Sequence, residues 1–118
     1  MHPLRGNLFE NMIIADIYKQ YANRARRSPL YFWRDENGEV EIDCIIDCGI
    51  KLIPIEIKSS QTINSHFFHG ITSWNEFTKN SDGGYLIYGG DDKLYQRSSN
   101  YVVGWQNIKN LVDIIEKP

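Results

Sequence analysis

Apolar side chains near the N-terminus recur every three or four residues, a spacing that predicts one long helix over residues 4–27. The apolar positions are Leu8, Phe9, Met12, Ile13, Ile17 and Tyr21. Asn7 is a candidate N-cap, and Glu10 stands three residues later, close to a capping-box arrangement. Ser28-Pro29 is expected to end the helix, because the residue before a proline avoids the helical conformation.

After residue 29 the pattern of apolar residues changes to one that predicts strands. Residues 30–35 are rich in aromatic side chains, residues 40–47 follow a turn at Asn37-Gly38, and residues 51–58 follow a turn at Cys48-Gly49. Helical spacing returns over residues 64–79, short apolar strands are expected at 85–88 and 101–105, and a last helix is expected from residue 107. The order α-β-β-β-α-β-β-α predicts an α/β fold with a mixed sheet flanked by helices, formed as a single domain over residues 1–118.

Composition narrows the class of protein. The 118 residues include 13 Lys and Arg and 15 Asp and Glu, for a net charge of −2, which excludes a strongly basic coat or histone-like protein. No apolar run approaches the roughly 20 residues of a membrane span, and the N-terminus has no signal-peptide pattern. Cys44 and Cys48 would lie about 13 Å apart in one strand, beyond disulfide reach, so we expect reduced thiols in a cytoplasmic protein without a membrane partner.

The stretch from residue 40 to residue 58 carries the candidate chemistry. Side chains alternate between the two faces of a strand, so Glu41, Asp43, Ile45 and Asp47 are expected opposite Val40, Ile42, Cys44 and Ile46. On the next strand, Ile53, Ile55 and Ile57 share one face and Pro54, Glu56 and Lys58 the other. Pro54 lacks a hydrogen-bond donor, which predicts an edge strand or a bulge. Pairing the two strands can place Asp43, Glu56 and Lys58 on one face.

Two carboxylates held by a rigid sheet suit Mg²⁺, which prefers oxygen ligands. Asp43 and Glu56 would bind the cation, Glu10 from the long helix would complete its shell, and Lys58 would orient a water or stabilise negative charge. The alternative is that an antiparallel hairpin with one wet face shows the same alternation without chemistry, and that Glu10 only caps the helix with Asn7.

Five separated segments resemble one uncharacterised family, the domain of unknown function found at the C-terminal end of many bacterial and archaeal AAA+-type ATPases. They are GNLFEN at 6–11, YFWRD at 31–35 followed by EID at 41–43, IPIEIKS at 53–59, GYLIYGGD at 84–91 and VGW at 103–105. The resemblance runs from about residue 6 to residue 108. It implies a restriction-endonuclease-like fold with a D…(D/E)-x-K pattern, in which Asp43, Glu56 and Lys58 are the catalytic residues and Glu10 is the helical carboxylate. Ile42 stands where that superfamily has a proline.

The resemblance also implies an ATPase domain on the same full-length chain, of which these residues would be the C-terminal part. The chain has no G-x-x-x-x-G-K-[ST] motif, so no nucleotide is expected to bind to this domain.

Three further groups of residues have two interpretations each. Arg24, Arg26 and Arg27, with Lys19 and Arg34, would contact nucleic-acid phosphates or form a solvated helix end. Gln61 and Thr62 would bind a phosphate or form the loop before the next helix. Cys44, Cys48, His66 and His69 depart from the usual zinc spacing, so no zinc is expected.

Two functions from different classes therefore follow. The first is a Mg²⁺-dependent phosphodiesterase, a nuclease-like domain associated with an ATPase and acting on nucleic acid. The second is a non-catalytic module of the same fold that docks an ATPase to DNA or to a protein partner. A homodimer is a further expectation, because many nucleases of this fold work in pairs.

Overall fold

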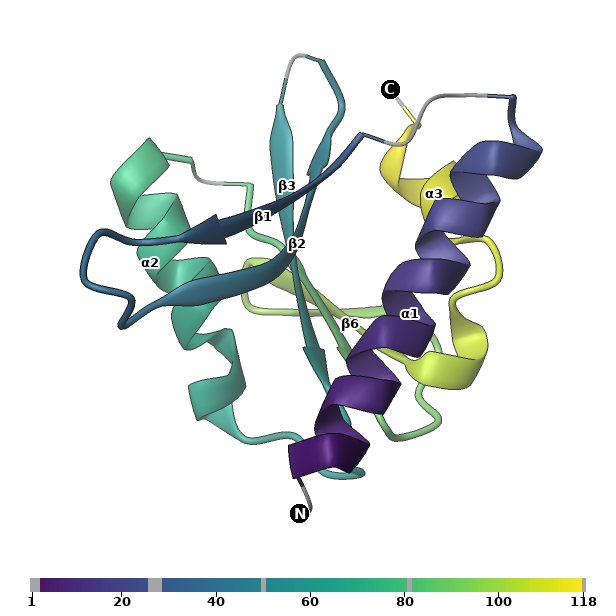
Figure 1. The fold of residues 1–118 in the computed structure, drawn as a ribbon, viewed down its shortest axis with the longest axis horizontal. Coiled ribbons are helices and arrows are strands. Elements are labelled where there is room, and N and C mark those ends of the chain that lie inside the picture. The colour runs from purple at the N-terminus through teal and green to yellow at the C-terminus, as the bar shows by residue number, and fades with distance from the viewer. Residues whose placement is uncertain (1–2, 26–28, 50, 81, 118) are drawn as a thin grey trace.

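The computed structural model describes residues 3–25, 29–49, 51–80 and 82–117, and Figure 1 shows its ribbon. The strands are β1 (Leu30–Arg34), β2 (Glu41–Asp47), β3 (Leu52–Lys58), β4 (Tyr85–Tyr88), β5 (Tyr95–Arg97) and β6 (Asn100–Gly104). The helices are α1 (Pro3–Asn23), η1 (Ser65–Phe68), α2 (His69–Thr78), η2 (Trp105–Asn107) and α3 (Leu111–Ile115), where η marks a 3₁₀ helix. None of these described helices has the length and apolar character needed to cross a membrane.

The strands form one mixed sheet in the order β1-β2-β3-β4-β6-β5. β1, β2 and β3 are antiparallel neighbours, β4 and β6 continue parallel to β3, and β5 returns antiparallel at the far edge. Figure 1 shows α1 and α3 on one face of this sheet and α2 on the other. The predicted α/β fold and its order of elements are confirmed, with β5 as an additional strand. This three-residue strand has only exposed side chains, so it leaves no apolar pattern in the sequence.

Two layers of apolar side chains hold the helices to the sheet. On the α1 face, Ile13, Ile17 and Tyr21 are buried against isoleucines of β3, including Ile55 and Ile57. The predicted face of β3 that carries Ile53, Ile55 and Ile57 is therefore the one that packs on α1. Burial of this apolar surface is the main term that fixes the position of α1 over the sheet.

The long helix begins and ends earlier than the sequence pattern indicates. α1 starts at Pro3, a residue favoured in the first turn of a helix, so Asn7 lies inside the helix and the predicted capping box with Glu10 is wrong. The helix ends at Asn23, and Ala25 adopts a left-handed conformation with φ of 54°. The end predicted at Ser28-Pro29 is therefore wrong, and Arg26, Arg27 and Ser28 lie outside the described residues.

Pro54 lies in the interior of the sheet, so the prediction of an edge strand or bulge at this residue is wrong. β3 runs between β2 and β4, and Pro54 is paired with Ile45 of β2. The pairing of β3 with β4 begins at Ile55, one residue later. Because Pro54 precedes the first pair with β4, its missing N–H does not interrupt that ladder.

Candidate functional site

β2 and β3 separate in the middle of the sheet, and this fork is where the predicted carboxylates lie. The strands pair from Asp47 and Leu52 to Cys44 and Ile55, and β3 then continues beside β4 as far as Lys58. Asp43 and Glu56 are the first residues beyond the last β2–β3 pair. Beyond this point, side chains and not backbone hydrogen bonds connect the two strands.

Side-chain carboxylates take over hydrogen bonds at the fork. The Oδ2 atom of Asp43 accepts the N–H of Ile57 at 2.9 Å, and the Oε1 atom of Glu56 accepts the N–H of Asp43 at 3.4 Å. The Asp43 carboxylate therefore satisfies a backbone donor of β3 that no longer faces a strand. Each carboxylate is oriented by the backbone of the opposite strand.

A bulge in β2 places Asp43 at the fork. Tyr31 is paired with Ile45 and Trp33 with Ile42, so three steps along β2 match two along β1. As a result Ile42 and Ile45 pack together with Trp74 on the α2 face. The strict alternation that predicts Ile42 and Ile45 on opposite faces is wrong here, because one extra residue reverses the direction of the side chains that precede it.

Burial and mutual repulsion raise the pKa values of the fork carboxyls. Glu56 is only 5% exposed, and burial, followed by the charge of Asp43, raises its pKa to about 8. Burial is also the main cause that raises the pKa of Asp43. Lys58 opposes these shifts, with its Nζ atom 3.9 Å from the Oε2 atom of Glu56. Burial and repulsion at the fork thus favour the protonated form of Glu56 near neutral pH.

Glu10 reaches the fork from α1. Its carboxyl is hydrogen-bonded to that of Asp43, and burial and the charge of Asp43 raise the pKa of Glu10. A hydrogen bond between two carboxyl groups requires a proton on one of them, and the raised pKa values of both groups favour a proton shared between them. In this structure Glu10 is therefore a partner of Asp43, and it does not bond back to Asn7 in a cap.

An open pocket of about 280 Å³ lies over the fork. Asp43, Glu56 and Lys58 line it together with residues 38–41 of the β1–β2 hairpin and with His66, His69 and Gly70. Gly70 allows α2 to approach closely, because a Cβ atom there would lie 3.0 Å from the Glu41 carbonyl oxygen and 3.3 Å from the Glu56 Cδ atom. The structure thus brings the three predicted catalytic residues into one pocket.

The donor set at the fork is of the kind that Mg²⁺ prefers. Two carboxyls, the buried Glu56 and the half-buried Asp43, share one pocket, and their raised pKa values mean that a divalent cation would compete with protons for them. Within residues 3–25, 29–49, 51–80 and 82–117, no three Asp, Glu, His or Cys side chains are arranged as a ready metal cluster. Mg²⁺ commonly binds through one or two carboxylates and completes its shell with water, so two carboxylates are a sufficient protein contribution.

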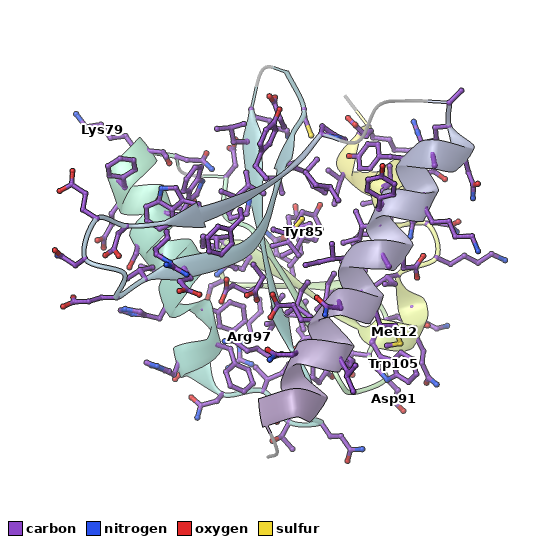
Figure 2. The ribbon with its side chains drawn as sticks, viewed as in Figure 1. Met12, Lys79, Tyr85, Asp91, Arg97 and Trp105 are labelled. Carbon is purple, nitrogen blue, oxygen red and sulfur yellow. The ribbon has the colours of Figure 1, made fainter. Side chains whose placement is uncertain are left out.

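The predicted nucleic-acid contacts do not gather at this pocket. Arg24 forms an ion pair with Asp113 of α3. Arg24 follows the last turn of α1, about 21 Å from Glu10 along the axis of that helix. Arg26 and Arg27 lie outside the described residues. Gln61 lines a separate pocket of about 330 Å³ with Met12 and Trp105, which Figure 2 shows together beside α1.

Sequence reasoning missed the two histidines of the pocket. The candidate site predicted from the sequence does not include His66 or His69, although both line the pocket, whereas Cys44 lies in the core and burial raises the pKa of its thiol to about 12. The imidazole rings are stacked, with centroids 5.5 Å apart. Their spacing of three residues, which places two side chains on one face of a helix, was the available signal.

Comparison with known proteins gives a family and nothing more specific. No curated protein and no solved structure matches the chain. One family model, described as a domain of unknown function (DUF4143), matches residues 5–108 of the 118. The match covers α1, the whole sheet and the pocket residues, and on this basis the chain belongs to the DUF4143 family.

Proposed function

We propose that this domain is a Mg²⁺-dependent phosphodiesterase that acts on nucleic acid. The observation that carries the proposal is the fork between β2 and β3, where the buried Glu56, the half-buried Asp43 and Lys58 take the place of backbone pairing and line one pocket. A strand pair could continue its ladder at no electrostatic cost. Instead, the chain places carboxyls with raised pKa values beside a lysine at this point, and strongly shifted ionisable groups are typical of functional sites.

Each residue of the fork has a role in this proposal. Asp43 and Glu56 would hold the cation, and Glu10 would orient Asp43 through their hydrogen bond. When bound, Mg²⁺ supplies positive charge that polarises a phosphate and makes a nearby water more acidic. Lys58, whose Nζ atom lies 3.9 Å from Glu56, would stabilise the negative charge that develops on the phosphate or orient the attacking water.

We further propose a restriction-endonuclease-like architecture, which the mixed sheet with helices on both faces supports. Three antiparallel strands, a parallel continuation, and helices on both faces position the carboxylates at the centre of the sheet. We further propose that the domain works beside an ATPase domain of a longer chain, in the cytoplasm. The non-catalytic docking module is the competing function, and the experiment below separates the two.

The test is Mg²⁺ binding by isothermal titration calorimetry at a pH above 8, followed by cleavage assays on DNA and RNA. We expect micromolar binding by the wild-type chain, and loss of both binding heat and cleavage in Asp43→Asn and Glu56→Gln. Glu39→Gln is the matched control, because Glu39 lines the same pocket but is exposed and lies outside the fork. Absence of heat in the wild type, or equal heat in Glu56→Gln, would favour the docking module.

A further inference from the structure

The η1 turn forms an aromatic wall beside the fork. Asn64 caps the turn by accepting the N–H of His66 at 2.8 Å, and four consecutive residues then carry rings. Phe67 and Phe68 are half-buried against the sheet, where they pack on the cluster formed by Leu86, Tyr88 and Val102. His66 and His69 are exposed and face the carboxylate pocket.

Cations from two different strands lie over the phenylalanine rings. The Nζ atom of Lys58, from β3, is 5.9 Å from the ring centroid of Phe67. The guanidinium carbon of Arg97, from β5, is 5.5 Å from the centroid of Phe68. Figure 2 shows Arg97 beside the lower end of α2 and its η1 turn. Cation–π contacts hold both charges against the wall, and Arg97 itself remains exposed.

The opposite wall of the pocket has the opposite charge. It consists of residues 38–41 of the β1–β2 hairpin, including Glu39 and Glu41, and of these Glu41 is paired with Arg34 at 3.0 Å. A phosphate backbone would therefore be attracted to the η1 side and repelled by the Glu39 side. A duplex presents phosphates on both flanks, so this asymmetric pocket suits one strand.

We propose that Lys58, His66, Phe67, Phe68, His69 and Arg97, which we name the η1 track, bind a single nucleic-acid strand. The cations contact successive backbone phosphates, and unpaired bases stack on the exposed imidazole and guanidinium planes. The η1 track adds a substrate class to the proposed function. It rests on that function for one statement, that the strand held by the track is the one presented to Asp43 and Glu56. It defines the substrate as single-stranded nucleic acid.

The test is fluorescence anisotropy with short labelled oligonucleotides of mixed sequence, single-stranded and duplex, in EDTA so that no cleavage occurs. Two variants remove parts of the track, Arg97→Gln and the double variant His66→Asn with His69→Asn. Lys109→Gln is the matched control, because Lys109 is an exposed cation between η2 and α3 and lies outside the track. All four side chains are exposed, so the variants are expected to fold, and thermal melting checks this.

We expect the wild type to bind single strands more tightly than duplex. Arg97→Gln should weaken single-strand binding about tenfold at low salt and reduce the slope of log affinity against log salt by about 0.7, the value for one lost phosphate contact. The histidine variant should weaken binding, and Lys109→Gln should leave it unchanged. Equal or tighter duplex binding, or wild-type affinity in both track variants, would overturn the proposal and leave the η1 turn as core packing.

The design separates this inference from the phosphodiesterase proposal because binding in EDTA needs no cation. Track-dependent binding of single strands without any Mg²⁺ heat or cleavage would contradict the phosphodiesterase and support the track. Cleavage that is insensitive to Arg97→Gln, with unchanged oligonucleotide affinity, would contradict the track alone. DNA and RNA oligonucleotides are run in parallel, and track-dependent binding of either supports the inference.

Discussion

The two ends of the β2–β3 pair show opposite uses of the same alternating sequence. At one end, Ile46 is paired with Ile53 and Cys44 with Ile55, and all four side chains are buried in the core. At the other end the strands separate, and Asp43 and Glu56 fill the space with carboxylates. The apolar end gains stability from burial, whereas each buried carboxylate at the fork costs stability until a proton or a cation neutralises it. The fork therefore lowers the free energy of unfolding, and the apolar end of the strand pair compensates for that loss.

The largest effect is expected at the paired end. Ile55→Ala removes a side chain that is 0% exposed and should lower the free energy of unfolding by about 4 kcal/mol, through lost burial and the cavity left behind. Leu52→Ala, at the same end but 42% exposed, is the control and should cost less than about 1 kcal/mol. Denaturant unfolding measures both. Similar losses for the two variants would mean that burial does not stabilise this end.

The fork should respond to pH in the opposite sense to an ordinary salt bridge. The pKa of Glu56 is raised in the folded chain from 4.5 to about 8, so its protonated form is favoured by folding. Its contribution to stability is complete below pH 4.5 and is lost as the pH rises through about 8. The raised pKa values of Asp43 and Glu10 act in the same direction. Without a divalent cation, unfolding free energy should therefore fall over this interval, with a slope for Glu56 of at most about 1.4 kcal/mol per pH unit.

Glu56→Gln isolates the contribution of this one carboxyl. Glutamine keeps the oxygen that accepts the N–H of Asp43 but has no proton to lose. The variant should be more stable than the wild type at pH 8 and should match it more closely at pH 5, as denaturant unfolding in EDTA would show. A fall in stability with pH that is equally steep in the variant would place the titration elsewhere.

A bound divalent cation should offset part of the destabilisation that the fork carboxylates cause. At a pH above 8, Mg²⁺ at one hundred times its dissociation constant should raise the unfolding free energy by about 2.7 kcal/mol. The gain should shrink toward pH 6, because protons compete with the cation for Glu56. Thermal melts with MgCl₂, matched in ionic strength with NaCl, measure this difference. Equal stabilisation of Glu56→Gln by Mg²⁺ would argue against binding at the fork.

The sequence predicted most of the paired end and the identity of the fork residues. Isoleucines at every second position of β3 specify a buried face, and the alternation brought Glu56 and Lys58 to the other one. Alternation and strand pairing also predicted Asp43 beside them, but they did not predict that Ile42 packs with Ile45, which follows from a bulge between these two residues. A bulge depends on the pairing of two strands, so the alternation within one strand cannot reveal it.

Other features were missed because they depend on contacts between distant segments. Pro54 looked incompatible with an interior strand, but the start of the β4 pairing at Ile55 removes the conflict. The η1 turn brings two histidines to a pocket whose carboxylates come from another part of the chain. Arg97 lies on a three-residue strand whose position is set by β6. The sequence predicts the residue types of the fork. The wall formed by the η1 turn and Arg97 could be recognised only from the folded structure.

The smallest effect is expected at this second wall and tests whether the wall and the fork are independent. Asn64→Ala removes the side-chain cap of η1, the 2.8 Å bond from the His66 N–H, and should lower unfolding free energy by about 1 kcal/mol. Asn110→Ala is the matched control, because Asn110 precedes α3 without making a side-chain cap bond. Calorimetry should show unchanged Mg²⁺ affinity in Asn64→Ala, since Asp43 and Glu56 are held by the backbones of β2 and β3. A parallel loss of Mg²⁺ affinity would instead mean that η1 positions Glu56 through Gly70, so that the wall and the fork act as one unit.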